Sequence, residues 1–378
     1  MKKIGILTFH KSINYGSVLQ AYALRKTLNN IGYDAEVIDY QPDNYKFLYG
    51  LVRKPNTLWR VKYDVVNILH SSFMKNRKKL FAEFREEFLN LSHEKYQFGD
   101  DISPINEKYD AVICGSDQIW NPKAKDSDIN FYLPIEHKAK KISYAVSLND
   151  GFADQYEDKE RYKNLIRDFN RLSVREKSAE RDLRGFIGDD KDIEVVLDPS
   201  LLLQKEDYEP ICAEKRVDKP YIFLYSVHHK DSTVRTAKKL SEKFSMPVYF
   251  LYTDFDAHKT AVENKEFIYP KKDTSPKEFI SFIKNAELVI TDSFHGTAFS
   301  IVFEKKFFSI AKLNENGEKI RDERICGILN RLDIEDRFIS EIEADNVSLS
   351  DEIDYTTVNK KRDELIKQSL DFLKSAID

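Results

Sequence analysis

The stretch "ELVITDSFHGTAFSIVF" (287–303) decides the fold class, because it changes from a strand pattern to a helix pattern within a few residues. A short apolar run, "ELVI", ends at a cluster of small and polar residues, and "TAFSIVF" then has the character of a helix. A strand that passes through a tight polar turn into a helix is the first half of a β-α-β unit, which builds parallel sheets. The stretch therefore indicates an α/β protein, and its turn holds His295 beside Gly296.

The same alternation of short apolar runs and longer amphipathic stretches extends along most of the chain. It predicts strands at 3–9, 34–40, 109–115, 140–147, 171–176, 193–200, 221–227, 247–253, 266–270, 287–291 and 306–311. Helices are expected between them, at 17–32, 153–170, 176–187, 231–245, 276–285 and 295–304, and in the tail at 356–376. A charged, mostly helical insertion is expected over about 42–107.

A chain of 378 residues exceeds the usual size of a single core, so two domains are expected. We predict an N-terminal Rossmann-like domain over 1–205, including the insertion, and a C-terminal Rossmann-like domain over 206–345. The segment 205–220 would be the hinge, and 346–378 a C-terminal helix that packs back on the N-terminal domain. Two doubly wound domains facing a cleft would bind ligands at the carboxyl ends of their strands.

Composition and charge narrow the class of protein. A net charge of −4 with both signs interspersed argues against a nucleic-acid-binding protein. Three distant cysteines predict neither a disulfide framework nor a zinc site, no spacing demands a metal, and a cytoplasmic location is the simplest. No run reaches the length of a membrane-spanning helix. The basic amphipathic stretch 56–84 leaves peripheral membrane contact as the alternative to a packed helical insertion.

Two polar turns follow strands of the N-terminal half. Asn14, Gly16 and Ser17 open a helix whose backbone N–H groups could bind an anion or a hydroxyl, although a helix start capped by Ser17 explains them equally well. Asp117 could accept a proton from a sugar hydroxyl, and Trp120 offers a flat face on which sugars stack. The alternatives are a capping role for Asp117 and a core position for Trp120.

Two further strand ends carry groups that suit a compact anion. Arg175 could hold a carboxylate or phosphate in a bidentate fork, unless Glu176 beside it is its own internal partner. Asp198, before a proline, is assigned to a turn. In the opening stretch, Ser293, His295, Gly296 and Thr297 form a turn into a helix start, where an anion is favoured and a histidine can donate a hydrogen bond or a proton.

Taken together, these turns resemble the polysaccharide pyruvyl transferase family. The resemblance covers the chain from the first strand to about residue 330 and rests on "GILTFHKSINYGSVLQAYAL", "DAVICGSDQIWNP", "SVRE", "LDPSLLL" and "TDSFHGTAFSIVF", in that order. It implies a GT-B-like fold and the transfer of a pyruvyl group from phosphoenolpyruvate to two sugar hydroxyls, with release of phosphate. Phosphoenolpyruvate would be a co-substrate, and no cofactor is implied.

The resemblance also implies roles for the residues of the matching motifs. Arg175 would hold the donor's carboxylate or phosphate, and His295 would bind its phosphate and serve as general acid, with Ser293, Gly296 and Thr297 on the donor side. Asn14, Gly16, Ser17, Asp117 and Trp120 would face the acceptor, with Asp117 as the candidate base. The acceptor would be an exopolysaccharide or capsule sugar, either polymeric or lipid-linked at the inner face of the membrane. The alternatives are a GT-B glycosyltransferase that uses a nucleotide sugar and a non-catalytic carbohydrate-binding homologue.

Overall fold

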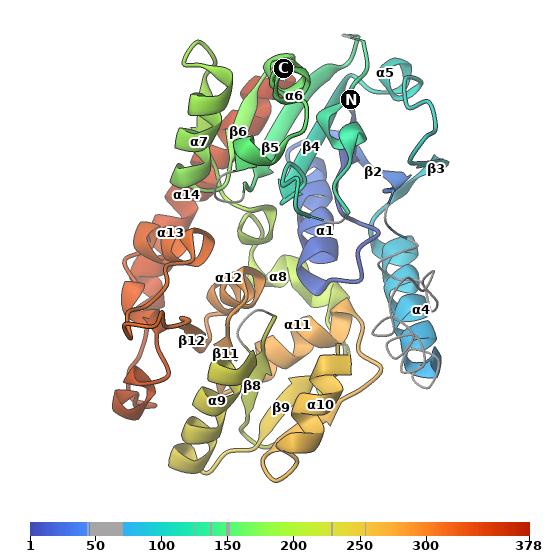
Figure 1. Cartoon of the computed structure of the whole chain (residues 1–378). Coiled ribbons are helices and arrows are strands. Elements are labelled where there is room, and N and C mark those ends of the chain that lie inside the picture. Colours follow the sequence, from blue (N-terminus) through green and yellow to red (C-terminus); the bar gives the residue numbers. More distant parts are fainter. Residues whose placement is uncertain are drawn as a thin grey trace. The chain divides into compact units, whose positions relative to one another are not determined.

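Two compact α/β units make up the chain (Figure 1). The computed structural model describes residues 1–43, 45, 71–124, 126–136, 138–148, 152–227, 230–253 and 255–378. The first unit comprises Met1–Met74, Phe81–Leu202 and Glu364–Asp378, and the second comprises Lys75–Leu80 and Leu203–Asp363.

The first unit contains a seven-stranded parallel sheet with the strand order β3-β2-β1-β4-β5-β6-β7. Its strands are β1 (Lys3–Leu7), β2 (Asp34–Gln41), β3 (Leu91–Gln97), β4 (Ala111–Asp117), β5 (Lys140–Val146), β6 (Leu172–Val174) and β7 (Ile193–Val195). The helices of this part of the chain are α1 (Tyr15–Asn30), α4 (Ser71–Phe88), α5 (Ile105–Lys108), α6 (Lys159–Arg167) and α7 (Lys177–Ile187), with 3₁₀ turns η1 (Ile129–Tyr132), η2 (Phe152–Gln155) and η3 (Pro199–Leu201).

The second unit contains a six-stranded parallel sheet with the order β10-β9-β8-β11-β12-β13. Its strands are β8 (Ile222–Tyr225), β9 (Val248–Leu251), β10 (Ile268–Lys271), β11 (Leu288–Thr291), β12 (Lys306–Ile310) and β13 (Phe338–Ile339). Its helices are α8 (Lys205–Tyr208), α9 (Lys230–Phe244), α10 (Phe255–Glu263), α11 (Pro276–Asn285), α12 (Phe294–Val302) and α13 (Glu323–Arg331), with 3₁₀ turns η4 (Glu209–Ile211), η5 (Glu335–Arg337) and η6 (Glu343–Asn346).

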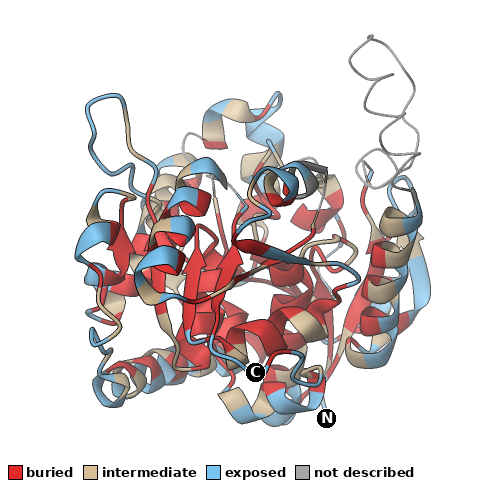
Figure 2. Ribbon diagram, turned by 90° about the horizontal axis from the view of Figure 1, so that it is seen from below, coloured by how far each residue is buried: buried red, intermediate tan, exposed pale blue. Residues whose placement is uncertain are grey.

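The central strands are buried along almost all of their length, as expected for parallel sheets that are covered on both faces. Every residue of "LVIT" in β11 and of "IFLY" in β8 is buried, and Figure 2 shows the strands largely in red. Burial on both faces explains why these strands are continuous apolar runs in the sequence rather than alternating ones.

Each sheet reverses its strand order at one point. The order runs outward on both sides from β1 and β4 in the first unit and from β8 and β11 in the second. In doubly wound sheets the loops that leave the carboxyl ends of the strands on either side of this switch point are where ligands bind. The loops after β1 and β4, and those after β8 and β11, are therefore the first places to look for a functional site.

The predicted strands are confirmed in both sheets, and the exceptions are two edge strands, β3 and β13. The insertion over 42–107 was expected to be mostly helical, and that expectation is wrong for β3, whose sequence "LSHEKYQ" pairs with β2 at the edge of the sheet. An edge strand exposes most of its side chains, so it lacks the apolar run by which the other strands were identified. The two-residue β13 was missed for its shortness. Of the basic stretch 56–84, residues 56–70 lie outside the described residues.

The last helix, α14 (Tyr355–Ile377), contributes residues to both units. Its first part belongs to the second unit, where the Tyr355 hydroxyl donates to the Lys305 carbonyl at 2.5 Å. Its remainder, from Glu364, belongs to the first unit, where the Ser369 hydroxyl oxygen accepts from the Leu197 N–H at 2.9 Å. One continuous helix therefore takes part in the packing of both units.

Gly296 allows α12 to pack directly on the end of β11. A Cβ atom at this position would lie 2.2 Å from Thr291 Oγ1 and 2.9 Å from Thr291 Cβ. The hydroxyl cannot easily move away, because it donates to the Tyr225 carbonyl at 2.7 Å and accepts from the Ser293 N–H at 3.0 Å. The glycine is thus required by the close approach of helix and strand.

We expect Gly296→Ala to lower the free energy of unfolding of the second unit by about 1–3 kcal/mol, because the new methyl group overlaps Thr291. Gly327→Ala in α13 is the matched control, since a Cβ there meets nothing within 4 Å. That change should be neutral or stabilising by up to about 1 kcal/mol, as alanine is the better helix former. Denaturant unfolding of the three proteins measures both effects, and equal stabilities for the two variants would contradict the packing argument.

Candidate functional site

The loop after β1 and the end of β4 meet at the switch point of the first unit. Asn14 caps α1, with its side-chain oxygen accepting from the N–H groups of Gly16 at 2.9 Å and Ser17 at 3.3 Å. The helix start is thus capped, but by Asn14 and not by Ser17 as the structural alternative assumed. The Ser17 hydroxyl instead donates to Asp117 Oδ2 at 2.7 Å. Three residues predicted on the acceptor side, Asn14, Ser17 and Asp117, therefore lie together.

Asp117 holds a constrained position at the end of β4. Its backbone has φ 76°, which is unusual for a residue other than glycine, and its carbonyl accepts from the Ser147 N–H at 3.0 Å. Its other carboxylate oxygen, Oδ1, accepts from the Gln118 N–H at 2.9 Å. These bonds hold a partly exposed carboxylate in a fixed orientation beside the start of α1.

A second carboxylate, Asp126, lies within electrostatic range of Asp117. Burial raises the pKa of Asp126 to about 6, and the negative charge of Asp117 contributes to this increase. Like charges held close together in a partly buried place oppose each other's ionisation. The acidic groups at this switch point therefore include one whose titration lies near neutral pH.

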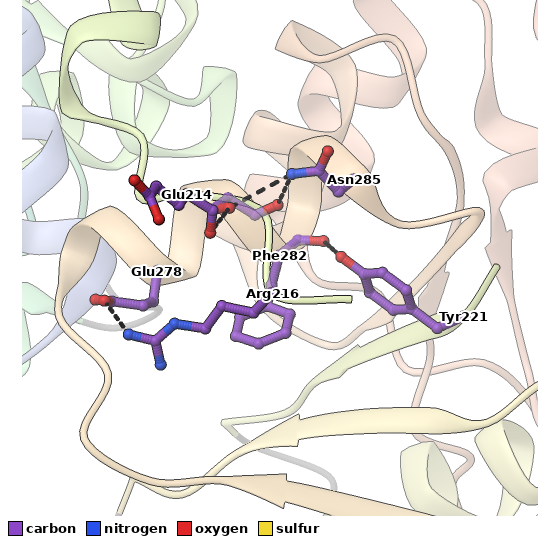
Figure 3. Close-up of a pocket in the computed structure, with 7 residues that line it drawn as sticks. Glu214, Arg216, Tyr221, Glu278, Phe282 and Asn285 are labelled. Atoms are coloured by element: carbon purple, nitrogen blue, oxygen red, sulfur yellow. Dashed lines mark hydrogen bonds and ion pairs between the residues drawn. The ribbon is translucent and has the colours of Figure 1, made fainter. Parts of the chain in front are cut away.

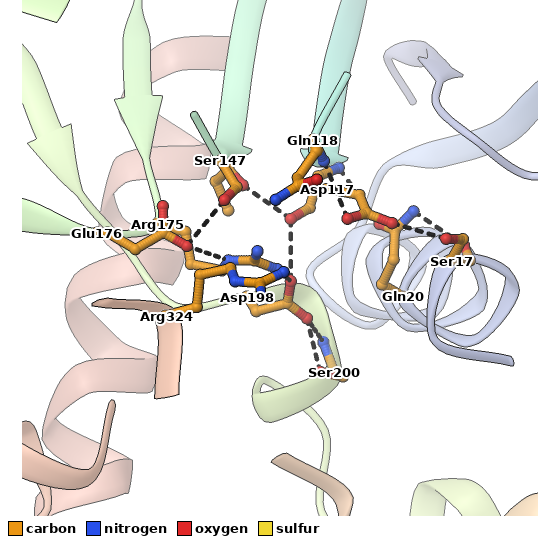
Figure 4. Close-up of polar contacts among 12 residues, drawn as sticks. Ser17, Gln20, Asp117, Gln118, Ser147, Arg175, Glu176, Asp198, Ser200 and Arg324 are labelled. Atoms are coloured by element: carbon orange, nitrogen blue, oxygen red, sulfur yellow. Dashed lines mark hydrogen bonds and ion pairs between the residues drawn. The ribbon is translucent and has the colours of Figure 1, made fainter. Parts of the chain in front are cut away.

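Arg175 follows β6 and lies between two carboxylates (Figure 4). Its Nε donates to Glu176 Oε1 at 2.6 Å and one terminal nitrogen donates to Asp198 Oδ2 at 2.8 Å. Burial alone would lower the pKa of Arg175, but the charges of Glu176, Asp198 and Asp117 outweigh it and raise the pKa above its usual range. The guanidinium is thus permanently charged, buried and oriented. The internal pair with Glu176, which was the structural alternative, is present.

The sequence did not single out a buried cluster at the ends of β1 and β2. His10 is fully buried, with Nδ1 3.2 Å from the Thr8 carbonyl and Nε2 3.3 Å from Asp39 Oδ1, and Lys11 forms an ion pair with Asp39. Burial lowers the pKa of His10, whereas its partners outweigh burial at Asp39 and lower the pKa of that carboxyl. Asp39 lies within β2 and not in a turn after a strand, so the sequence pattern did not mark it as a candidate. The cluster anchors the beginning of the loop that leads to Asn14.

In the second unit, Asp292 joins the two strand ends at the switch point. This buried carboxylate follows β11 and accepts from the Ser226 hydroxyl at 2.5 Å and from the Val227 N–H at 2.6 Å, both just after β8. It also accepts from the Thr233 hydroxyl in α9 at 3.1 Å. Asp292 thereby fixes the turn that carries His295 to the neighbouring strand end.

His295 lies in the first turn of α12, where the sequence predicted a helix start. Ser293 is the residue at the N-cap, and His295 is 8 % exposed, with its ring packed edge-on against Phe294. The N–H of Gly296 belongs to this first turn, whose donors cannot be satisfied within the helix. The helix dipole at this end favours negative charge.

The structure corrects the predicted roles of Thr297 and Trp120. Thr297 is fully buried, its N–H donates to the Ser293 carbonyl at 3.0 Å, and its hydroxyl bonds the same carbonyl and Ser309, so it supports the helix internally. Trp120 is also fully buried, stacked on Tyr132 and bonded through Nε1 to a backbone carbonyl. Its ring is part of the core of the first unit and has no open face for a sugar.

Arg324 is a further arginine that the sequence analysis passed over. It lies at the start of α13, and its guanidinium bonds both carboxylate oxygens of Asp322, at 3.1 and 2.7 Å. Asp322 is also the N-cap of that helix and accepts from the Arg324 N–H. The pair follows an irregular segment after β12 instead of a strand end, so no strand-to-helix signal marked it.

A small pocket lies at the amino ends of the strands of the second sheet, on the opposite side from these loops (Figure 3). It is not a candidate for the functional site. It lies beside Tyr221, which precedes β8, and its volume of about 10 Å³ holds about one water molecule. Its arginine and tyrosine have internal partners, since Arg216 donates to Glu278 at 2.7 Å and the Tyr221 hydroxyl donates to the Phe282 carbonyl at 2.8 Å. The pocket is too small for a sugar or a phosphate ester.

Within the part of the chain that the structure describes, no group of three or more histidine, cysteine, aspartate or glutamate side chains is placed to hold a metal ion. Among the same residues, no helix combines the length and the apolar character that crossing a membrane requires.

Comparisons with known proteins agree with the architecture. The model of the family described as polysaccharide pyruvyl transferase matches residues 14–312. A search of curated proteins finds no match. Among solved structures, the UDP-GlcNAc 2-epimerase from Methanocaldococcus jannaschii is similar with a TM-score of 0.51 at 14 % identity, over 97 % of this chain and 99 % of that one. S. aureus MnaA, in a co-structure with UDP, gives a TM-score of 0.50 at 12 % identity, over 98 % and 89 %. At such identities the likeness concerns the fold, and it confirms the expected GT-B-like class.

We expect Asp126→Asn to stabilise the protein at neutral pH and to have no such effect in acid. Because the folded-state pKa of about 6 lies above the usual value of about 3.9, ionisation is disfavoured in the folded state, and stability falls as the pH rises between the two values. The variant should gain up to about 2–3 kcal/mol at pH 7 and little at pH 4, as measured by denaturant unfolding. Asp189→Asn, at an exposed carboxylate of the same unit, is the control. An equal gain at both pH values would refute the electrostatic explanation.

Proposed function

The chain belongs to the polysaccharide pyruvyl transferase family, and from this we propose that it transfers a pyruvyl group from phosphoenolpyruvate to two hydroxyls of a sugar, forming a cyclic ketal. The sugar belongs to a cell-surface polysaccharide, such as a capsule or exopolysaccharide, or to its lipid-linked precursor. The observation that carries the proposal is the fixed, charged Arg175 in the family motif "SVRE", followed in the same matched region by a histidine at a helix start.

The donor is a compact, highly charged anion, and two features of the matched region suit it. Arg175 provides an oriented guanidinium, the group that recognises carboxylates and phosphates through paired N–H donors. The start of α12 provides a helix dipole and the Gly296 N–H, which favour a phosphate. Ser293 and His295 lie in the same turn. We assign Arg175 to the donor's carboxylate or phosphate and His295 to its phosphate.

The chemistry needs a proton donor and a proton acceptor. A proton, supplied by His295, adds to the methylene carbon and makes C2 electrophilic. One sugar hydroxyl attacks C2 and loses its proton to a base, the C2–O bond to phosphate breaks, and phosphate leaves with the bonding electron pair. The second hydroxyl then bonds to C2 and releases its proton, which closes the ketal. Phosphoenolpyruvate is consumed as a co-substrate, and the scheme includes no resident cofactor.

The acceptor side is assigned to the switch point of the first unit. Asp117 is held by Ser17 and by a backbone N–H, and it is partly exposed, so it is the candidate base for the attacking hydroxyl. Asn14 and Gly16 shape the loop beside it. The cytoplasm is the proposed location, because phosphoenolpyruvate is a metabolite of that compartment and lipid-linked precursors are exposed at the inner face of the membrane.

We expect the purified protein to release inorganic phosphate from phosphoenolpyruvate in the presence of a suitable sugar from an acceptor panel, with pyruvate addition seen by mass spectrometry. Arg175→Ala and His295→Ala should each lower kcat/KM about 100-fold or more, since each removes a charged hydrogen bond or a proton donor. Arg181→Ala and His93→Ala, at exposed side chains, are the matched controls and should retain activity.

Two outcomes would contradict the assignment. Release of UDP or GDP from nucleotide sugars, without turnover of phosphoenolpyruvate, would indicate a glycosyltransferase. Sugar binding without turnover of any donor would indicate a carbohydrate-binding homologue.

We expect Asp117→Asn to lower kcat about 10²-fold or more, because removing a general base costs about that factor. The affinity for phosphoenolpyruvate, measured by calorimetry, should change little, since the residue is assigned to the acceptor. Ser17→Ala removes the hydroxyl that orients the carboxylate, so it should also lower kcat, but by a smaller factor. Full activity of Asp117→Asn would rule out this residue as the base.

A further inference from the structure

Asp198 carries the further inference, which rests on the proposed function. It was assigned from the sequence to a turn, and it does cap the short 3₁₀ turn η3. Its contacts extend well beyond that turn. We propose that Asp198 is a positioning residue of the donor site, whose carboxylate sets the orientation of the Arg175 guanidinium.

The two carboxylate oxygens of Asp198 have different partners. Oδ1 accepts from the N–H of Ser200 at 2.9 Å and from its hydroxyl at 2.6 Å. Oδ2 accepts from Arg175 at 2.8 Å and from the Ser116 hydroxyl at 3.0 Å. One oxygen therefore serves the local turn, and the other joins the end of β4, where Ser116 lies, to the end of β6, which precedes Arg175 (Figure 4).

Burial makes this arrangement energetically demanding. Asp198 is 1 % exposed and Arg175 is 6 % exposed, so neither charge is solvated by bulk water. A buried charge that loses its partner is strongly destabilising, whereas capping a turn requires only one neutral acceptor. A turn alone would be satisfied by an asparagine or a serine. The ionised carboxylate is needed for the arginine.

Two carboxylates on different nitrogens fix the plane of the guanidinium. Glu176 binds Nε, and it is itself held by the Ser147 hydroxyl at 3.0 Å, while Asp198 binds a terminal nitrogen. A free arginine side chain has about 2 kcal/mol of rotamer entropy, which a ligand would otherwise have to offset on binding. A guanidinium held in place beforehand binds a planar anion with less loss of entropy. Asp198 thus acts on the donor through Arg175 without contacting it.

Asp198→Asn separates the two roles of the carboxylate. The amide keeps an oxygen for the Ser200 contacts, so the turn can stay capped, but its NH₂ group faces Arg175 with a donor instead of an acceptor. Ser200→Ala is the matched control, because it removes one bond on the turn side and leaves the arginine side intact. Ser116→Ala is the second variant, since it removes the hydroxyl that donates to Oδ2 without placing a new polar group beside Arg175.

The test is a double-mutant cycle on the affinity for phosphoenolpyruvate, measured by calorimetry without any acceptor. We expect Asp198→Asn to weaken Kd at least tenfold, which is about 1.4 kcal/mol, Ser116→Ala to weaken it about threefold, and Ser200→Ala to leave it within twofold. In the Arg175→Ala background, Asp198→Asn should have no further effect, because the residue acts through the arginine. A merely structural role would instead give the same loss in both backgrounds.

The outcomes separate this inference from the proposed function. If Arg175→Ala weakens donor binding while the Asp198→Asn and Ser116→Ala proteins bind as wild type does, the positioning role is refuted and the proposed function stands. If Asp198→Asn does not fold, wild-type affinity in Ser116→Ala refutes the role, and a loss there that vanishes in the Arg175→Ala background supports it. Absence of donor binding in the wild-type protein would overturn both.

Discussion

Burial of polar strand ends is the constraint on which the rest of this structure depends. Parallel strands covered on both faces bring their carboxyl ends to one edge of each sheet, where polar groups are removed from water. A buried polar group without a partner is costly, so the polar groups at these ends need hydrogen-bond partners. Asp198 in the first unit and Asp292 in the second provide such partners with one carboxylate each, by joining the ends of two strands.

This constraint also explains how the same groups serve structure and chemistry. Asn14 caps α1 and, in doing so, leaves the Ser17 hydroxyl to orient Asp117. Gly296 lets α12 approach β11 closely, and this same approach holds the helix start that carries His295. The residues that the proposed reaction uses are therefore fixed by interactions that the fold requires in any case, which lowers the cost of ordering them when a substrate binds.

The central strands and the strand-to-helix turns could be predicted because their signals are local. An apolar run that ends in small and polar residues marks a buried parallel strand wherever it occurs, so most strands and the polar turns that follow them were predicted. The edge strand β3 could not be found in this way, because exposure makes its residues polar. Trp120 and Thr297 were assigned to binding sites because each follows a strand end, but both side chains are buried. Their burial follows from packing with distant residues, which the local pattern does not show.

The sequence by itself determined the α/β class, the order of the two sheets along the chain, the positions of the polar turns and the family, since all of these depend on patterns within short segments. Only the tertiary structure decided which distant residues are partners. Ser17 is bound to Asp117, Arg175 to Asp198, and the segment after β8 to Asp292. Such pairs arise because crossovers return the chain to the same edge of a sheet, and the partner of a buried charge is set by that geometry, which no spacing along the chain records.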